Sequence, residues 1–137
     1  MLVDGGLEIL DEGDAWALLR SGVVGRVGVT MGALPAIFPV NYAVVGDAIV
    51  FRTAPGTKFA AATADAVVAF EVDDFEQAER TGWSVLAVGR AEVVHDLQLT
   101  FDVLAAALAP FADGPRTTIV RIRPEFVSGR RIVHAEP

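Results

Sequence analysis

The chain has no cysteine, one lysine and one tyrosine among its 137 residues, and these scarcities exclude several classes of protein. Without cysteine there can be no disulfide framework, thiolate nucleophile or cysteine-ligated metal. The two histidines, His95 and His134, stand far apart in the sequence, and no carboxylate pattern beside them suits a metal. We therefore expect structural or surface roles for both, and no metal site.

Positive charge is also scarce. A net charge of −7 and a pI near 4.7 argue against nucleic acid as the partner, because binding the phosphate backbone needs a concentrated basic surface. The acidic start resembles no secretory signal, and no apolar run approaches the roughly 20 residues that cross a bilayer. The sequence therefore predicts a cytoplasmic protein that does not bind a membrane. Its length predicts a single domain over residues 1–137.

The first half of the chain predicts one helix and three strands. An acidic entry followed by Ala15, Leu18 and Leu19 favours a short amphipathic helix that opens the fold and that Gly22 ends. Strands are expected near 24–31, 35–45 and 48–54, and the links between them are short enough to require antiparallel neighbours. A Pro-Gly turn then leads into a second short helix, with Thr57 as its N-cap.

The second half continues the strands. Residues 66–72 alternate as a strand, a polar loop is expected from Asp73 to Gly82, and residues 83–94 form a long strand that bends at Gly89. An apolar stripe over 97–108 predicts another helix that Pro110 ends, and residues 117–133 form one strand, or two interrupted at Pro124. About six or seven strands with two or three short helices define a mainly antiparallel α+β barrel.

One cluster stands out from this framework. Two cations and two hydroxyl donors lie within seven residues around the Pro-Gly turn: Arg52, Thr53, Thr57 and Lys58. Such groups beside a helix start can hold a phosphate monoester, although a charged surface turn with an ordinary N-cap fits the local pattern equally well. The preceding strand favours the ligand, because it carries the only asparagine and tyrosine and offers a surface for a flat apolar ring.

Other candidate sites have weaker support. The glycines at 22, 25 and 28 have the wrong spacing for a dinucleotide-binding loop, and they lead from helix to strand. Ser84 has no histidine and acid partners in order. The pair Asp73–Asp74 could serve as a general acid and base, but a solvated strand end explains it better.

Taken together, "PAIFPVNYAVVGDAIVFRTAPGTKFAA", "VVAFEVDD" and "GWSVLAVGRAEVV" resemble the pyridoxamine 5′-phosphate oxidase-like, FMN-binding split-barrel family, in its small actinobacterial members. The resemblance implies a six-stranded antiparallel split barrel with short flanking helices, and a homodimer that holds FMN between its subunits. It assigns the flavin phosphate to Thr53, Thr57 and Lys58, with Arg52 adjacent. It assigns the flavin ring to Phe38, Pro39, Val40 and Asn41, and it implies that Trp83 and Ser84 contribute from the partner subunit.

The resemblance departs from the true oxidase at the C-terminus, where no arginine and histidine set for a phosphorylated substrate is evident, so vitamin B6 oxidation is not expected. The leading hypothesis is an FMN-dependent oxidoreductase acting on a small planar molecule, in which the flavin supplies the chemistry and no side chain is catalytic. The alternatives are a deazaflavin-dependent reductase and a non-catalytic cofactor-binding or storage dimer. Haem, with His95 or His134 as ligand, is a third choice.

Overall fold

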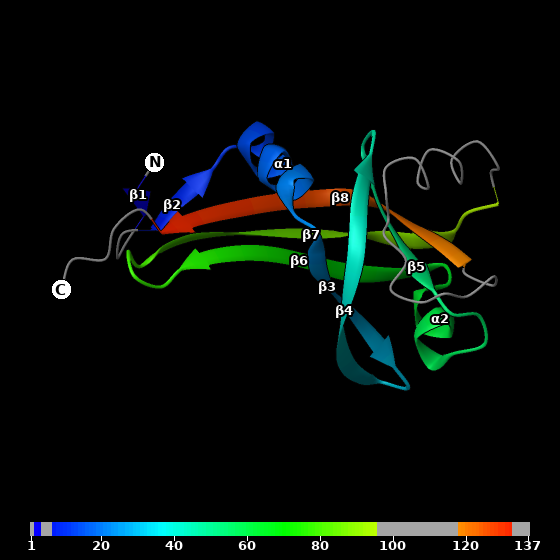
Figure 1. Ribbon diagram of the computed structural model, residues 1–137. Helices are drawn as coiled ribbons and strands as arrows, with labels where there is room; N and C mark the ends of the chain where they lie inside the picture. The colour runs from blue at the N-terminus through cyan, green and yellow to red at the C-terminus, as the bar shows by residue number, and fades with distance from the viewer. Residues whose placement is uncertain (1, 4–6, 96–117, 133–137) are drawn as a thin grey trace.

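The computed structural model describes residues 2–3, 7–95 and 118–132, which contain eight strands and two helices (Figure 1). Their bounds in chain order are β1 Leu2–Val3, β2 Leu7–Leu10, α1 Glu12–Ser21, β3 Val24–Met31, β4 Leu34–Val45, β5 Ala48–Thr53, α2 Lys58–Thr63, β6 Ala66–Glu76, β7 Thr81–Val93 and β8 Thr118–Ile132. The stripe predicted to form a helix over 97–108 lies outside the described residues, as does His134.

All neighbouring strands are antiparallel, in the order β1-β2-β8-β5-β4-β3-β6-β7, and β7 pairs again with β8. That last pairing closes β3 to β8 into the predicted six-stranded barrel. The expectation that a helix opens the fold was wrong, because β1 and β2 precede α1. Neither was predicted, since β1 has two residues and β2 has four, too few for a readable alternation.

The barrel is split because its strands differ in length and change partners. In Figure 1, β6, β7 and β8 run side by side along the molecule, and β3, β4 and β5 cross them steeply. One edge of β8 pairs with β7 along its length, whereas the other pairs with β5 at 118–122 and with β2 at 129–132. This exchange of partners leaves an arm projecting beyond the closed part of the barrel, in which the β6–β7 hairpin is paired with the end of β8 and β8 with β2.

The long strands β6, β7 and β8 test three of the sequence predictions. The polar loop expected from Asp73 was wrong: β6 continues to Glu76, and only residues 77–80 separate it from β7. Both faces of the arm are largely exposed there, so polar residues enter the strand without ending it. The bend expected at Gly89 was confirmed, because the β7–β8 register shifts between Val88 and Gly89. Pro124 lies at this irregularity, within one continuous strand.

The core fills the barrel and is closed at one end by α1. Buried side chains come from every strand of the ring, and Phe51 and Phe70 are the largest of those that are fully buried. As predicted, Leu19 on α1 is buried and Gly22 ends the helix. The Tyr42 hydroxyl donates a hydrogen bond of 2.6 Å to the Leu19 carbonyl, which ties α1 to β4. At the other helix, Phe59 of α2 packs against Phe38 of β4 and Phe51 of β5, so the core also holds these three elements together.

Candidate functional site

The segment from β4 through β5 to α2 carries eight of the ten residues that the sequence assigned to a cofactor. Thr53 is the last residue of β5, and Thr57 is the N-cap of α2, as predicted, with extended backbone at φ −85° and ψ 160°. The Thr57 hydroxyl donates to the Ala54 carbonyl at 2.9 Å and accepts from the Ala60 amide at 3.0 Å. The hydroxyl thus stabilises the turn. A phosphate could accept a hydrogen bond from it only by replacing the Ala54 carbonyl as the acceptor.

Thr53 is one of two buried polar side chains in the described part of the chain, and its environment differs from that of the other. Thr63, also buried, donates to the carbonyls of Phe59 and Ala60 at 3.0 and 3.1 Å. The Thr53 hydroxyl is buried and has no hydrogen-bond partner in the described structure. An unsatisfied buried hydroxyl is unfavourable by about 1–3 kcal/mol, so its retention calls for an explanation.

A second buried oxygen without a partner belongs to Asn41. Its Oδ1 atom is enclosed on β4 and accepts no hydrogen bond within the described ranges. Across the β4–β5 hairpin the last pair is Tyr42 with Phe51, which places Asn41 beside Arg52 one step further on. Both unsatisfied oxygens, on Asn41 and Thr53, therefore belong to residues that the sequence assigned to a ligand.

Arg52 and Thr53 do not lie on the same face of β5. Phe51 belongs to the main core, whereas Val50 packs in a second cluster with Val94 and Ile119. Because side chains alternate along a strand, Thr53 lies on the face of Phe51 and Arg52 on that of Val50. The two members of the predicted cluster that lie on β5, Arg52 and Thr53, are thus on opposite faces of that strand.

The β4 strand has an open edge along its first half. Leu34 to Asn41 pair with β3, and β5 pairs only with Tyr42 to Val45, so within the described chain the other edge of 34–41 has no strand partner. The Tyr42 amide donates to Val23 next to β3, at 3.0 Å. The backbone groups of alternate residues, Ile37, Pro39 and Asn41 among them, therefore point to the open edge.

This open edge suits a ligand better than another strand. Pro39 has no N–H, so the edge cannot form a continuous ladder, but carbonyls and the amides of Ile37 and Asn41 remain for a ring with its own donors and acceptors. On the inner face Phe38 packs against Phe59 of α2, with ring centroids 4.7 Å apart, and Val40 also contacts the core. Phe38 and Val40 thus form the floor, while Pro39 and Asn41 lie on the opposite face of β4.

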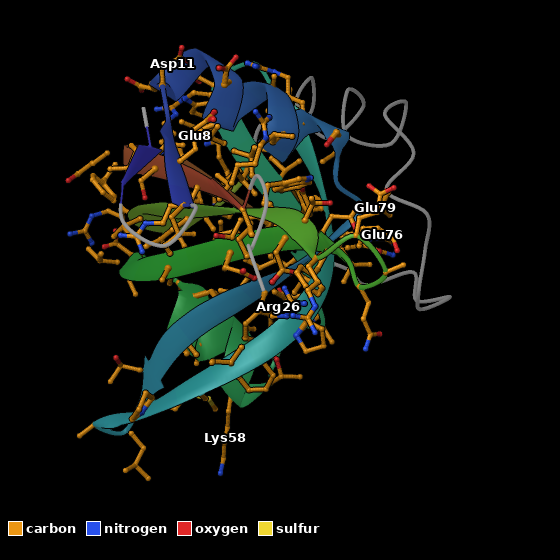
Figure 2. All side chains as sticks on the ribbon, turned by 90° about the vertical axis from the view of Figure 1, so that its left-hand side faces the viewer. Glu8, Asp11, Arg26, Lys58, Glu76 and Glu79 are labelled. Carbon is orange, nitrogen blue, oxygen red and sulfur yellow. The ribbon has the colours of Figure 1, made fainter. Side chains whose placement is uncertain are left out.

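Lys58 begins α2 and has an exposed side chain. In the described residues it forms no ion pair, whereas four arginines do: Arg26 with Glu71 and Asp73, Arg90 with Asp65, Arg121 with Glu92 and Arg131 with Glu8. Figure 2 shows Lys58 pointing away from the barrel at one end, with Glu8, Asp11, Glu76 and Glu79 toward the other. An isolated cation is therefore available to an anion in an otherwise acidic protein.

Trp83 and Ser84 lie near the start of β7, in the arm that projects beyond the barrel. They border an open hollow of about 410 Å³ with Asp74, Phe75 and Arg130 among its other walls. The start of β7 and α2 lie at opposite ends of the molecule (Figure 1). A single chain therefore does not bring these two residues to the β4–α2 segment.

Two acidic residues on β6 form an ion-pair network with Arg26 of β3. Arg26 contacts the carboxylates of Glu71 at 2.6 Å and Asp73 at 3.4 Å. Burial raises the pKa of Glu71 above its usual value, and Asp73 adds to the shift, while Arg26 opposes it. These exposed ion pairs agree with a solvated strand end and not with a general acid and base.

In the ranges that the structure describes, no group of three or more His, Asp or Glu side chains could hold a metal ion.

Comparison with known proteins identifies this architecture. A closed split β-barrel with a strand–turn–helix segment at one end defines the class. The profile described as pyridoxamine 5′-phosphate oxidase matches residues 11–131, so the chain belongs to that family. An uncharacterized protein from Mycobacterium tuberculosis is 43% identical over 129 residues, covering 90% of this chain and 84% of its own length.

Two solved structures share the fold and part of the sequence. An FAD-binding protein from Mycobacterium smegmatis has a TM-score of 0.83 and 37% identity, covering 91% of this chain and 98% of its own. An FAD-binding protein from Mesorhizobium loti has a TM-score of 0.77 and 27% identity, with coverages of 91% and 97%.

Neither of the two described helices of the present chain, α1 and α2, is long and apolar enough to cross a membrane.

The sequence missed one part of this region. The tip of the β3–β4 hairpin lies against α2, and an open groove of about 540 Å³ is lined by Thr30, Met31, Gly32, Lys58, Ala61 and Ala62. Its walls are mostly small and apolar, which in the sequence looks like an ordinary hairpin turn followed by a helix rich in alanine. Only Lys58 gave a signal, and that signal pointed to phosphate alone.

Proposed function

We propose that this protein binds a flavin nucleotide, with the phosphate held near Thr53, Thr57 and Lys58 and the ring along the open edge of β4. The buried, unsatisfied hydroxyl of Thr53 is the observation that carries the proposal, because a bound phosphate oxygen would accept a hydrogen bond from it. The FAD-binding relatives at 37% and 27% identity support a flavin as the ligand class. FMN is the unit that the cluster requires, and FAD contains the same unit.

The residues fit this ligand in charge and in shape. Lys58 offsets phosphate charge as a point cation, and the Thr53 hydroxyl donates to an oxygen that water does not reach. Phe38 and Val40 support the ring from the core side, and the Ile37 and Asn41 amides can address its edge. Arg52, on the other face of β5, contributes positive potential instead of direct contact with the Thr53 side.

The bound flavin would supply two-electron transfer, and the chain would supply binding, orientation and shelter from water. On this basis we assign the protein an oxidoreductase activity toward a small planar molecule. No described side chain near β4 and α2 is placed as an acid, base or nucleophile, so catalysis rests on how the ring is positioned. Exposure of one ring face along the β4 edge would admit the substrate.

We further propose a homodimer that completes this site. Partner positions across five strands form an uncharged row on the outer face of the barrel: Ile37, Gly28, Ala69, Val88 and Phe126. Of these, Ile37 is 72% and Phe126 is 54% exposed. Large apolar side chains exposed together on one surface are typical of an interface with another protein molecule. A second copy packed on this row would bring the partner's Trp83 and the partner's Ser84 toward the flavin.

The dimer is tested by placing a charge in the row. Ala69→Arg should convert the protein to a monomer and abolish flavin binding, because a buried unpaired cation strongly disfavours an interface. Ala17→Arg, on the exposed face of α1, is the matched control and should change neither property. Sedimentation at micromolar concentration reads the result, and a dimeric Ala69→Arg protein would show that the interface lies elsewhere.

The phosphate assignment is tested with Lys58→Ala and two ligands. FMN and riboflavin share the ring and differ in the phosphate, so the loss of one charge-assisted contact should weaken FMN by about 30-fold and leave riboflavin unchanged. Arg80→Ala removes an exposed cation from the β6–β7 turn and serves as the control for net charge. Equal losses for FMN and riboflavin would mean that Lys58 does not meet the phosphate.

A further inference from the structure

Charged side chains flank the uncharged row that we propose as the dimer contact, and they differ in sign between its two sides. On one side, two residues along β3 and β6 from the row, Arg26 and Glu71 are register partners. On the other side, Arg90 of β7 and Arg123 of β8 are register partners. Side chains two residues apart share a face of their strand, and register partners share a face of the sheet. Both pairs therefore lie on the same outer face as the row.

The side of the row with Glu71 has a surplus of negative charge. Arg26 contacts the carboxylate of Glu71 at 2.6 Å and that of Asp73 at 3.4 Å, so two carboxylates share one guanidinium. Burial raises the pKa of Glu71, and the neighbouring Asp73 raises it further. Of the two carboxylates, Asp73 is held at the longer distance and is the more exposed. We call this group the carboxylate side; its members are Arg26, Glu71 and Asp73.

The other side of the row has the reverse imbalance. Arg90 donates from Nη1 to the carbonyl of Asp65 at 2.9 Å and to its carboxylate at 3.3 Å. Arg123 lies directly opposite Arg90, is exposed, and forms no ion pair within the described ranges. Like charges directly opposite each other on neighbouring strands are destabilising, so this pair is unfavourable in an isolated chain. We call this group the arginine side; its members are Asp65, Arg90 and Arg123.

Two copies of the chain can bring these opposite sides together. In an isologous contact the same surface of each copy meets around a two-fold axis, and for two faces in contact that axis lies in the plane between them. An axis directed along the row places the arginine side of each copy against the carboxylate side of the other. An axis directed along the strands places each side against its own equivalent, so that like charges are opposed. The charges therefore favour the first arrangement.

We infer that the two copies associate with the two-fold axis directed along the row, and that Arg123 of each copy forms an ion pair with the partner subunit's Asp73. The inference rests on the homodimer proposed above. Each copy has one guanidinium and one carboxylate in surplus, so the two ion pairs balance the charge beside the apolar row. Complementary charges across a contact fix the register in which two surfaces associate and disfavour the alternatives.

The test reverses one charge on each side of the row and measures the dimer dissociation constant of the full chain by sedimentation. Arg123→Glu and Asp73→Arg should each weaken the dimer at least about tenfold, because each change opposes like charges twice in a symmetric dimer. Circular dichroism should show that both variants are folded. Arg123→Glu places a carboxylate opposite Arg90, which is a favourable cross-strand pair within the chain.

Two combinations of these changes should restore association. In a mixture of the Arg123→Glu and Asp73→Arg proteins, every contact of the mixed dimer joins a cation with a carboxylate. The mixed dimer should therefore form at least about tenfold more tightly than the dimer of either variant. A double variant with both changes in one chain should return to within about threefold of wild type. Structural damage from either substitution would persist in both combinations instead of being cancelled.

Glu12→Arg and Arg20→Glu are the matched controls, because they make the same changes of net charge at exposed positions on α1. Both should leave the dimer dissociation constant unchanged. If neither reversal in the row weakens the dimer, or if neither combination restores it, the inference is overturned while the homodimer stands. If wild-type protein sediments as a monomer, the proposed homodimer fails and the inference fails with it.

Discussion

Replacing Thr53 by valine should change stability and ligand affinity in opposite directions. The side chain is 4% exposed, and its hydroxyl has no partner in the described structure. Valine has nearly the same shape, suits a strand and carries no group to desolvate. Since an unsatisfied buried hydroxyl costs about 1–3 kcal/mol, Thr53→Val should raise the free energy of unfolding of the flavin-free protein by about 1 kcal/mol.

The same change should weaken flavin binding. If the hydroxyl donates to a phosphate oxygen, its removal eliminates one charge-assisted hydrogen bond, which contributes about 2 kcal/mol. The dissociation constant for FMN should rise about 30-fold. Riboflavin, which has no phosphate, should bind both proteins alike. A residue that destabilises the free protein and stabilises its complex is the signature of a binding position.

The assay needs thermal unfolding and flavin titration at one fixed protein concentration. Thr53→Val should raise the melting temperature of flavin-free protein by about 3 °C. Thr63→Val is the matched control, because Thr63 is also buried but its hydroxyl bonds to Phe59 and Ala60. It should lose about 1 kcal/mol and leave FMN affinity unchanged. A less stable Thr53→Val protein, or one with unaltered FMN affinity, would refute the reasoning.

Three further changes test the account of the fold. Ala33→Gly should stabilise the protein by about 1 kcal/mol in urea titration, because Ala33 has a φ of 70° that only glycine adopts without strain; a loss would contradict the turn geometry. Burial raises the pKa of Tyr42 to about 12, so wild-type stability should fall between about pH 10 and 12, where the unfolded tyrosine ionises first. Tyr42→Phe should lose about 1 kcal/mol at neutral pH and show a smaller alkaline loss; an unchanged alkaline slope would exclude Tyr42 as its source. The raised pKa of Glu71 means that its stabilising contribution is present in acid and is lost as pH rises through that pKa, so Glu71→Gln should stabilise the protein near pH 7 and make no difference near about pH 4. Equal urea midpoints for that variant and wild type at both pH values would contradict the shift.

Local rules predicted most of the barrel from the sequence. The short antiparallel links between β3, β4 and β5, the N-cap at Thr57 and the bend at Gly89 each follow from one or two residues, and all were confirmed. The polar stretch after Asp73 could not be read in this way. Its strand is held by pairing with β7 in a two-sided exposed arm, and not by a buried face of its own.

The candidate site was predictable in its residues but not in its arrangement. The spacing of Arg52, Thr53 and Lys58 indicated one cluster, whereas the end of β5 turns Arg52 and Thr53 to opposite faces. The missing hydrogen bonds of Asn41 and Thr53 depend on burial by distant segments, which no local pattern reports. The open groove between α2 and the tip of the β3–β4 hairpin likewise exists because a hairpin tip meets a helix that follows it by more than 20 residues.

The central claim is that a flavin phosphate is captured where β5 leads into α2. The most direct measurement is equilibrium dialysis of wild-type, flavin-stripped protein against FMN and riboflavin in parallel. The account predicts that FMN binds at least about 30-fold more tightly than riboflavin, because only FMN engages Thr53 and Lys58. Equal affinities for the two ligands, or no binding of either, would contradict it.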